Sequence, residues 1–205
     1  MKLTVLGASG ATGHQLTRQA LERGHSVTAI ARDPSRIAVP DSDRLKCVGA
    51  DVRDPQAIVQ ALAGSTTVLS GLGVAKGDKP GVLTAGARAV VAAKPERIIW
   101  LGAIGTGASA VAAGLLTRIL LRMFLGAELE DKVTADTIVL TAGGTVFHAG
   151  PLTNESLSPT RRTATLDILP WRIFPSSVSR ATVAAAMLDE AERQHHVGQT
   201  VVPLG

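Results

Sequence analysis

The chain has 205 residues, of which 45% are hydrophobic, 19% are charged and 2% are aromatic. This length and composition allow one domain with a substantial core, and they exclude a disordered or low-complexity protein. The formal charge of +4 comes from lysines and arginines scattered along the chain, and three phenylalanines and two tryptophans offer little surface for stacking bases. We therefore expect a globular protein that does not bind nucleic acid.

Strand-like and helix-like segments alternate along the first half of the chain, which indicates parallel βαβ units. The pair Asp54-Pro55 predicts the start of a helix, with Asp54 as N-cap and Pro55 at the first helical position. The expected strands are residues 2–6, 26–31, 45–48, 67–70 and 97–101, and the other expected helices are residues 10–23 and 81–93.

The second half of the chain gives weaker patterns. Residues 127–142 begin as a helical pattern, but Thr137–Leu140 has strand propensity, so both assignments stay open. Residues 145–148 are a short strand candidate, Ser179 caps a helix over 180–193, and residues 200–204 are a candidate seventh strand. We expect an α/β fold with a doubly wound parallel sheet in the strand order 3-2-1-4-5-6, and a ligand crevice at the carboxyl ends of strands 1 and 4.

A glycine-rich turn, GASGATG at residues 7–13, joins the first strand to the first helix. Gly7 permits the tight turn, Gly10 lets the backbone approach a phosphate, and Gly13 lets the helix pack closely on the strand. The helix N-terminus offers N–H groups and the positive end of its dipole to an anion. The alternative is a turn without a ligand, but strand, turn and helix in this order favour a dinucleotide site of the Rossmann type. Its expected residues here are Gly7, Ser9, Gly10, Ala11, Thr12 and Gly13.

The residue after the second strand indicates which nicotinamide cofactor binds. NAD sites place Asp or Glu there, whereas this chain has Arg32, whose guanidinium suits a 2′-phosphate, and Arg36 is a candidate second contact. The alternative is that Arg32 is a solvated loop charge. The sequence therefore predicts NADP(H). Position in the fold adds further candidate contacts, namely Asp51 and Val52 beside the adenine, and Ser70, Gly71 and Leu72 after the fourth strand.

Several motifs together resemble the atypical short-chain dehydrogenase/reductases of the NAD(P)H-binding, NmrA-like type, a group that includes flavin and biliverdin reductases. The motifs are GASGATG, ARDP at 31–34, GADVRD at 49–54, RIIWLGAIG at 97–105, HAGPLTNE at 148–155 and VSRATVA at 178–184. The resemblance implies one Rossmann domain over residues 1–205, with a helix over 127–142 and strand 6 at 145–148. We also expect a small substrate-side cap from residues 104–126 and 150–178. If the protein is a reductase, Ala103, Gly150, Pro151 and Leu152 are expected to shape the nicotinamide side of the pocket.

The chain departs from that family at the catalytic positions. Active short-chain reductases use a Tyr-x-x-x-Lys pair with a serine near the end of strand 5. This chain has no tyrosine, and Gly102-Ala103 stands where the serines are expected. Lys132 is in about the right place for the lysine, with Glu128 four residues before it. Alcohol–carbonyl chemistry through that relay is therefore excluded.

Two features, His148 and the pair Glu128 and Lys132, are weak candidates to replace the missing acid. His148, at the end of strand 6, is the best titratable candidate, although a histidine at a strand end is more often a structural hydrogen-bonder. Glu128 and Lys132 at i,i+4 spacing are most simply an ion pair on a helix surface. His195 and His196 near the C-terminus are expected to be solvated. The catalytic candidates are thus His148 and Lys132, and no metal site is predicted.

Two functions remain. The first is an NADPH-dependent reductase of a conjugated acceptor, flavin or quinone-like, because such an acceptor holds the charge left by a hydride. The second is a non-catalytic NADP-binding sensor of the NmrA-like type. The protein is expected to be a monomer or a homodimer.

We also expect a cytoplasmic protein without membrane insertion. The first strand pattern begins directly after Met1, which leaves no room for a signal peptide. The apolar stretch at 108–127 carries Arg118 and Arg122, so it is expected to be a helix used for packing, for a flap over the pocket or for a subunit contact. The single cysteine, Cys47, excludes an internal disulfide, and its apolar neighbours favour a place in the core.

Overall fold

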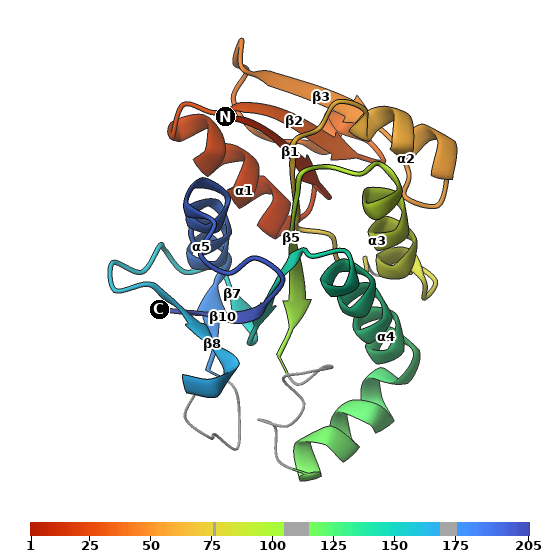
Figure 1. Ribbon diagram of the computed structural model, residues 1–205, viewed down its shortest axis with the longest axis vertical. Coiled ribbons are helices and arrows are strands. Elements are labelled where there is room, and N and C mark those ends of the chain that lie inside the picture. The colour runs from red at the N-terminus through yellow and green to blue at the C-terminus, as the bar shows by residue number, and fades with distance from the viewer. Residues whose placement is uncertain (76, 105–114, 169–175) are drawn as a thin grey trace.

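The protein has three layers, with a central sheet between two groups of helices (Figure 1). The computed structural model describes residues 1–75, 77–104, 115–168 and 176–205, and for residues 115–127 it describes the backbone alone. The helices are α1 (Ala11–Glu22), α2 (Pro55–Leu62), α3 (Val82–Ala92), α4 (Leu115–Thr141) and α5 (Arg180–Arg193). Figure 1 shows α1 and α5 on one face of the sheet and α2, α3 and α4 on the other.

Within the described residues, the central sheet has eight strands in the order β3-β2-β1-β4-β5-β6-β10-β8. They are β1 (Lys2–Leu6), β2 (Ser26–Ala31), β3 (Leu45–Gly49), β4 (Thr67–Ser70), β5 (Arg97–Ala103), β6 (Thr145–Ala149), β8 (Arg162–Thr165) and β10 (Thr200–Leu204). Neighbouring strands pair in parallel except β8 and β10, which are antiparallel. The predicted order 3-2-1-4-5-6 is confirmed, and the candidate seventh strand is β10.

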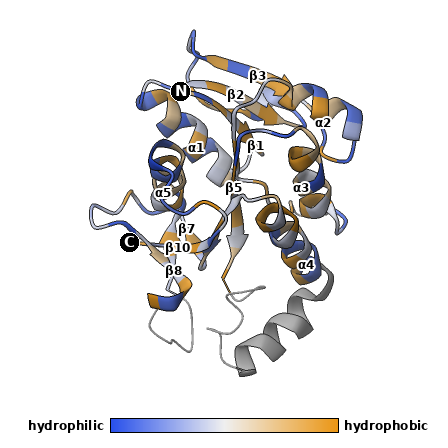
Figure 2. Cartoon of the chain, in the orientation of Figure 1, coloured by the Kyte–Doolittle hydropathy of each residue, from blue (hydrophilic) through white to orange (hydrophobic). Residues whose placement is uncertain are grey.

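Two apolar clusters hold the helix layers to the sheet. Leu3 and Val5 of β1 enter the cluster beneath α1 and α5, while Leu6 enters the cluster beneath α2, α3 and α4. This is the alternation of a strand that is buried on both faces. Figure 2 shows hydrophobic residues along the central strands and hydrophilic residues on the outer loops. Burial on both faces explains why the strands of this sheet read as apolar runs in the sequence.

Local chemistry sets the predicted helix starts. Asp54 is the N-cap of α2 and its carboxylate accepts hydrogen bonds from the N–H groups of Gln56 and Ala57, as the sequence predicts. Ser179 caps α5 by accepting from the N–H of Thr182. Of residues 127–142, all but the last belong to α4, so the helical assignment of that stretch is confirmed.

Cys47 lies on the surface, so its predicted place in the core is wrong. It belongs to β3, an edge strand of the sheet, where Leu45 and Val48 are partly buried against the apolar clusters but Cys47 is exposed.

The predicted cap falls partly outside the described residues. Residues 105–114 and 169–175 are not described, nor are the side chains of 115–127, so the predicted apolar face of 108–127 lies outside as well. Within 150–178, β8 extends the central sheet, and β7 (Leu152–Thr153) pairs in parallel with β9 (Val178–Ser179) in a second small sheet. The role of these segments as a cap stays a prediction. None of the described helices has the length and apolar content needed to cross a membrane.

Candidate cofactor site

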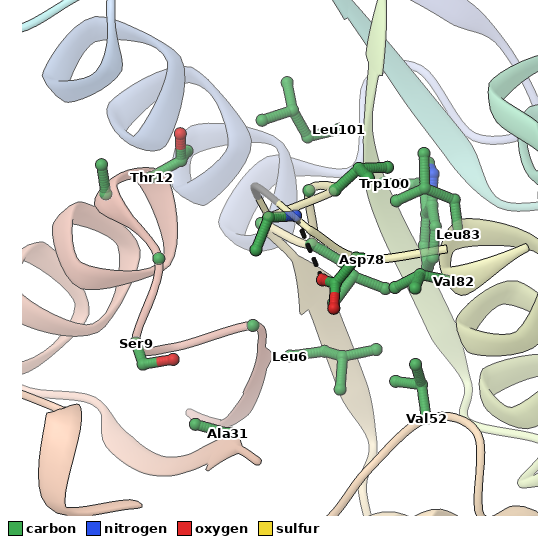
Figure 3. A pocket seen from close by; sticks show the side chains of 18 of the residues that line it. Leu6, Ser9, Thr12, Ala31, Val52, Asp78, Val82, Leu83, Trp100 and Leu101 are labelled. Carbon is green, nitrogen blue, oxygen red and sulfur yellow. Dashed lines mark hydrogen bonds between the residues drawn. The ribbon is translucent and has the colours of Figure 1, made fainter. Parts of the chain in front are cut away.

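A pocket of about 500 Å³ opens at the carboxyl ends of the parallel strands. It runs from the glycine turn after β1, past the ends of β2 and β3, to the ends of β5 and β6. In Figure 3, Ser9 and Thr12 lie on one side of it, and Val52, Val82, Leu83 and Trp100 lie on the other. The crevice therefore lies at the edge of the sheet where the strand order predicts a ligand.

The glycine turn packs backbone against backbone. Gly7 has φ +76°, in the left-handed region that favours glycine, and its N–H donates to the carbonyl of Ile30. A Cβ on Gly13 would lie 2.1 Å from the carbonyl oxygen of Gly7, so only glycine fits there. Helix α1 starts after Gly10, which has no side chain to cap it, and Ala11 and Thr12 of its first turn line the pocket. The first N–H groups of α1 are thus left for an anion.

Most of the residues that the sequence predicts for the cofactor line this pocket. They are Gly7, Ser9, Gly10, Ala11, Thr12, Arg32, Arg36, Asp51, Val52, Gly71, Leu72, Ala103, Gly150 and Leu152. Three predicted residues, Gly13, Ser70 and Pro151, are not among the lining residues. Gly13 supports the turn from behind, and the Ser70 hydroxyl accepts a hydrogen bond from the N–H of Leu72. These two positions shape the pocket through the backbone.

At the end of the pocket formed after β2 and β3, Arg32 is paired with an acid that the sequence does not reveal. Its Nη1 and Nη2 donate to the two carboxylate oxygens of Asp78, at 2.7 and 3.2 Å. The hydrogen bond to Asp78, together with its charge, raises the pKa of Arg32. Asp78 lies 46 residues away along the chain, so no local motif could have shown the pairing. Arg32 thus forms an ion pair while its side chain stays half exposed, and its use for a 2′-phosphate stays a prediction.

At the other end of the pocket, a buried pair lies behind β5. The Nε2 of His148 lies 3.0 Å from Oδ2 of Asp136 on α4, and both side chains are almost fully buried. Asp136 lines the pocket, whereas His148 does not. A Cβ on Gly102 would lie 2.8 Å from both carboxylate oxygens of Asp136 and 2.9 Å from the ring of His148. A side chain at this position would require Asp136 or His148 to shift.

Glu128 and Lys132 of α4 also differ from expectation. Glu128 and Lys132 are half-buried and both line the pocket. The ion pairs among described residues do not include one between them, so their interpretation as a surface pair is wrong. The reason is that this face of α4 turns toward the pocket and not toward open solvent. Lys132 is thereby placed beside the same cavity as Gly102 and Ala103.

Arg180 is a further pocket residue that the sequence does not single out. It is the first residue of α5, and its Nη1 donates to the carbonyl of Leu152 and to Oδ1 of Asn154. It lines the main pocket and also an adjoining hollow beside Ser9 and Gly10. Only its position next to Ser179 in the motif VSRATVA could have drawn attention to it, because its place beside the glycine turn depends on the tertiary structure.

Comparison with known proteins decides the family. A family model described as NAD(P)H-binding matches residues 7–194. The chain belongs to this NAD(P)H-binding family. The match confirms the resemblance inferred from the motifs, and it begins at Gly7, the first glycine of the turn.

Individual relatives of this NAD(P)H-binding protein are distant. YwnB of Bacillus subtilis, an uncharacterised protein, is 27% identical over 216 residues, covering 96% of this chain and 94% of YwnB. A short-chain dehydrogenase/reductase of Veillonella parvula in complex with NADP has a TM-score of 0.80 at 16% identity, covering 100% and 94% of the two chains. A protein of Streptococcus pneumoniae described as a candidate NADH-flavin reductase has a TM-score of 0.79 at 20% identity, covering 100% and 99%. At these identities the two solved structures show a shared fold.

The pocket of this NAD(P)H-binding protein suits a dinucleotide in three respects. The turn at Gly7 and Gly13 admits no side chain, the N-terminus of α1 is uncapped, and the cavity continues from there to Gly102 and Ala103. Its walls beyond the turn combine apolar side chains, such as Val52, Leu83 and Trp100, with charged ones. The residues present therefore fit the cofactor that the family binds.

Proposed function

We propose that this NAD(P)H-binding protein is an NADPH-dependent reductase of a conjugated acceptor, flavin or quinone-like, that works without a Ser-Tyr-Lys relay. The observation that carries the proposal is the chemistry of the pocket walls. Among the described lining residues, hydroxyl side chains occur at Ser9 and Thr12, beside the glycine turn, and none occurs beside Gly102 and Ala103. The chain offers the acceptor no tyrosine.

Such a pocket suits an acceptor that needs no acid from the protein. The bound cofactor supplies a hydride, and a conjugated acceptor delocalises the resulting negative charge until water protonates it. In this proposal Ser9 and Thr12 bind the pyrophosphate with the first N–H groups of α1, and Arg32 with Arg36 holds the 2′-phosphate. The apolar Val52 lies against the adenine. The flavin activity named for the Streptococcus pneumoniae neighbour supports the choice of acceptor class.

The small residues at the far end of the pocket have a positioning role in this proposal. Ala103, Gly150 and Leu152 leave room for the nicotinamide and a flat acceptor against it. Lys132 is a cation that lines the cavity, and it attracts an acceptor that gains negative charge. His148 is assigned a structural role, because it is buried against Asp136 and does not line the pocket.

The direct test is turnover. Purified protein is mixed with NADPH or NADH and with each member of a panel of flavins, quinones and aldehydes. Loss of the reduced cofactor is followed by the absorbance of its nicotinamide ring. We expect turnover with flavins or quinones and none with aldehydes. If NADP and NADPH bind with similar affinity and no acceptor of the panel is reduced, the reductase hypothesis is rejected and the sensor hypothesis is favoured.

The 2′-phosphate assignment is tested by Arg32→Gln. Loss of a charge-assisted contact of this kind costs about 1.5–3 kcal/mol, so NADPH should bind about ten- to hundredfold more weakly while NADH changes little. Isothermal titration calorimetry of both cofactors measures this. Arg44→Gln is the matched control, because Arg44 is exposed and does not line the main pocket. Equal losses for the two cofactors would contradict the assignment.

A further inference from the structure

The loop after β4 crosses the adenosine end of the pocket. Asp78 closes a turn in which its N–H donates to the carbonyl of Ala75 at 2.9 Å. The next residue, Lys79, is held from the far side, because its carbonyl accepts from Nη2 of Arg53 at 2.6 Å. Arg32 and Arg53 follow β2 and β3 respectively, so the loop is fastened to both strands whose ends border the proposed adenosine site.

A backbone contact holds the Asp78 carboxylate in addition to its pair with Arg32. Its Oδ2 accepts from the N–H of Ala75 at 3.1 Å, and the same carboxylate takes the fork of the Arg32 guanidinium. The Asp78 side chain is 11% exposed, against 50% for Arg32. The hydrogen bond from Arg32 holds the pKa of Asp78 below its ordinary value, so Asp78 is an anion at neutral pH. In Figure 3, Asp78 is among the residues that line the pocket.

A carboxylate in this position competes with a 2′-phosphate for the same hydrogen-bond donors of Arg32. Both anions bind a guanidinium through paired N–H groups, and like charges that share one cation repel each other. A 2′-hydroxyl is neutral, so it does not repel the Asp78 carboxylate and does not need the Arg32 guanidinium. The consequence is that the Arg32–Asp78 pair penalises a cofactor with a 2′-phosphate and leaves a cofactor without one nearly unaffected.

We propose that Asp78 is a selectivity determinant of the adenosine subsite, acting as an internal competitor of the 2′-phosphate for Arg32. NADP(H) must displace the carboxylate from Arg32, whereas NAD(H) binds with the pair intact. The affinity ratio of NADP(H) to NAD(H) is therefore smaller than Arg32 would give without Asp78. This inference rests on the proposed use of Arg32 for the 2′-phosphate.

The test compares Asp78→Asn with the unchanged protein, using adenosine 2′,5′-bisphosphate and 5′-AMP as probes in titration calorimetry, followed by NADP and NAD. These fragments report the adenosine subsite without an acceptor or turnover. We expect Asp78→Asn to bind the 2′-phosphorylated probe and NADP about tenfold more tightly, equivalent to about 1.4 kcal/mol, with 5′-AMP and NAD within about twofold. The double variant Arg32→Gln with Asp78→Asn should show no gain over Arg32→Gln alone.

Asp43→Asn is the matched control, since it removes the same charge from an exposed loop residue that does not line the pocket. Thermal unfolding confirms that each variant is folded. Equal changes for the two probes, or weaker binding of adenosine 2′,5′-bisphosphate by Asp78→Asn, would overturn the inference. If the unchanged protein discriminates the probes through Arg32 and Asp78→Asn alters nothing, this inference fails alone. If no adenine nucleotide binds any variant, the proposed cofactor function fails with it.

Discussion

Gly13→Ala is expected to destabilise the protein by at least about 3 kcal/mol, the upper end for overpacking a well-packed site. The added Cβ would lie 2.1 Å from the carbonyl oxygen of Gly7, and 2.7 to 2.8 Å from other backbone atoms of Gly7 and Ala8. Backbone atoms have no rotamer to change, so the collision is relieved only by moving α1 away from β1. Urea unfolding followed by circular dichroism measures the loss.

The sign of this result is informative because helix propensity acts in the other direction. Gly13 lies within α1, where alanine is favoured over glycine by about 1 kcal/mol. A loss of stability is therefore steric. Gly73→Ala is the control, since a Cβ there meets no heavy atom within 4 Å. A Gly13→Ala variant as stable as the unchanged protein would show that the turn is not packed as described. Nucleotide binding should fall with the displaced α1.

Glu190→Gln is the second large effect, with an expected loss of about 3–5 kcal/mol at pH 7. The Glu190 carboxylate is buried and accepts from Nη2 of Arg97 at 2.8 Å, and from the N–H of His196 at 3.0 Å. Glutamine keeps the shape but leaves the guanidinium of Arg97, itself nearly buried, without its counter-charge. Urea unfolding at pH 7 gives the difference. Glu22→Gln is the control, because the pair of Glu22 with Arg18 is exposed and is worth less than about 0.5 kcal/mol.

The same pair gives a pH dependence whose sign is fixed. Burial opposes ionisation of Glu190, but hydrogen bonds from His196 and Arg97 outweigh it, so its pKa lies below the ordinary value. A lowered pKa contributes stability above the unfolded value of about 4.3, and that contribution is lost as pH falls through the folded pKa. The stability difference between the unchanged protein and Glu190→Gln should shrink below about pH 4. A difference that stays constant into that range would contradict the role of the charge.

This cluster also corrects the sequence analysis. His196 was expected to be solvated with His195, but His196 is half-buried and its Nδ1 lies 2.9 Å from Oε2 of Glu190. The chain turns sharply after α5, with Gln194 in the left-handed region, and this turn brings His196 back to the helix end. A period or motif does not encode such a return, because it depends on one backbone conformation.

The sequence by itself determined the parts of this protein that rest on local or periodic patterns. The glycine spacing, the Asp54-Pro55 helix start and the apolar runs predicted the elements and most of the proposed cofactor contacts, since each pattern depends on neighbours along the chain. The strand order followed from the general topology of alternating strands and helices. The absence of tyrosine, which argues against the usual relay, was likewise visible in the composition alone.

The tertiary structure alone decided the pairings between distant charges. It placed Asp78 on Arg32, and it placed His148 against Asp136 behind Gly102. Which acid pairs with which base depends on the course of the loops and on the rotation of the helices. No local sequence pattern encodes a pairing between residues that are far apart in the chain. The glycine turn thus predicts a dinucleotide site from sequence, whereas the charge pairs at the two ends of that site are known only from the fold.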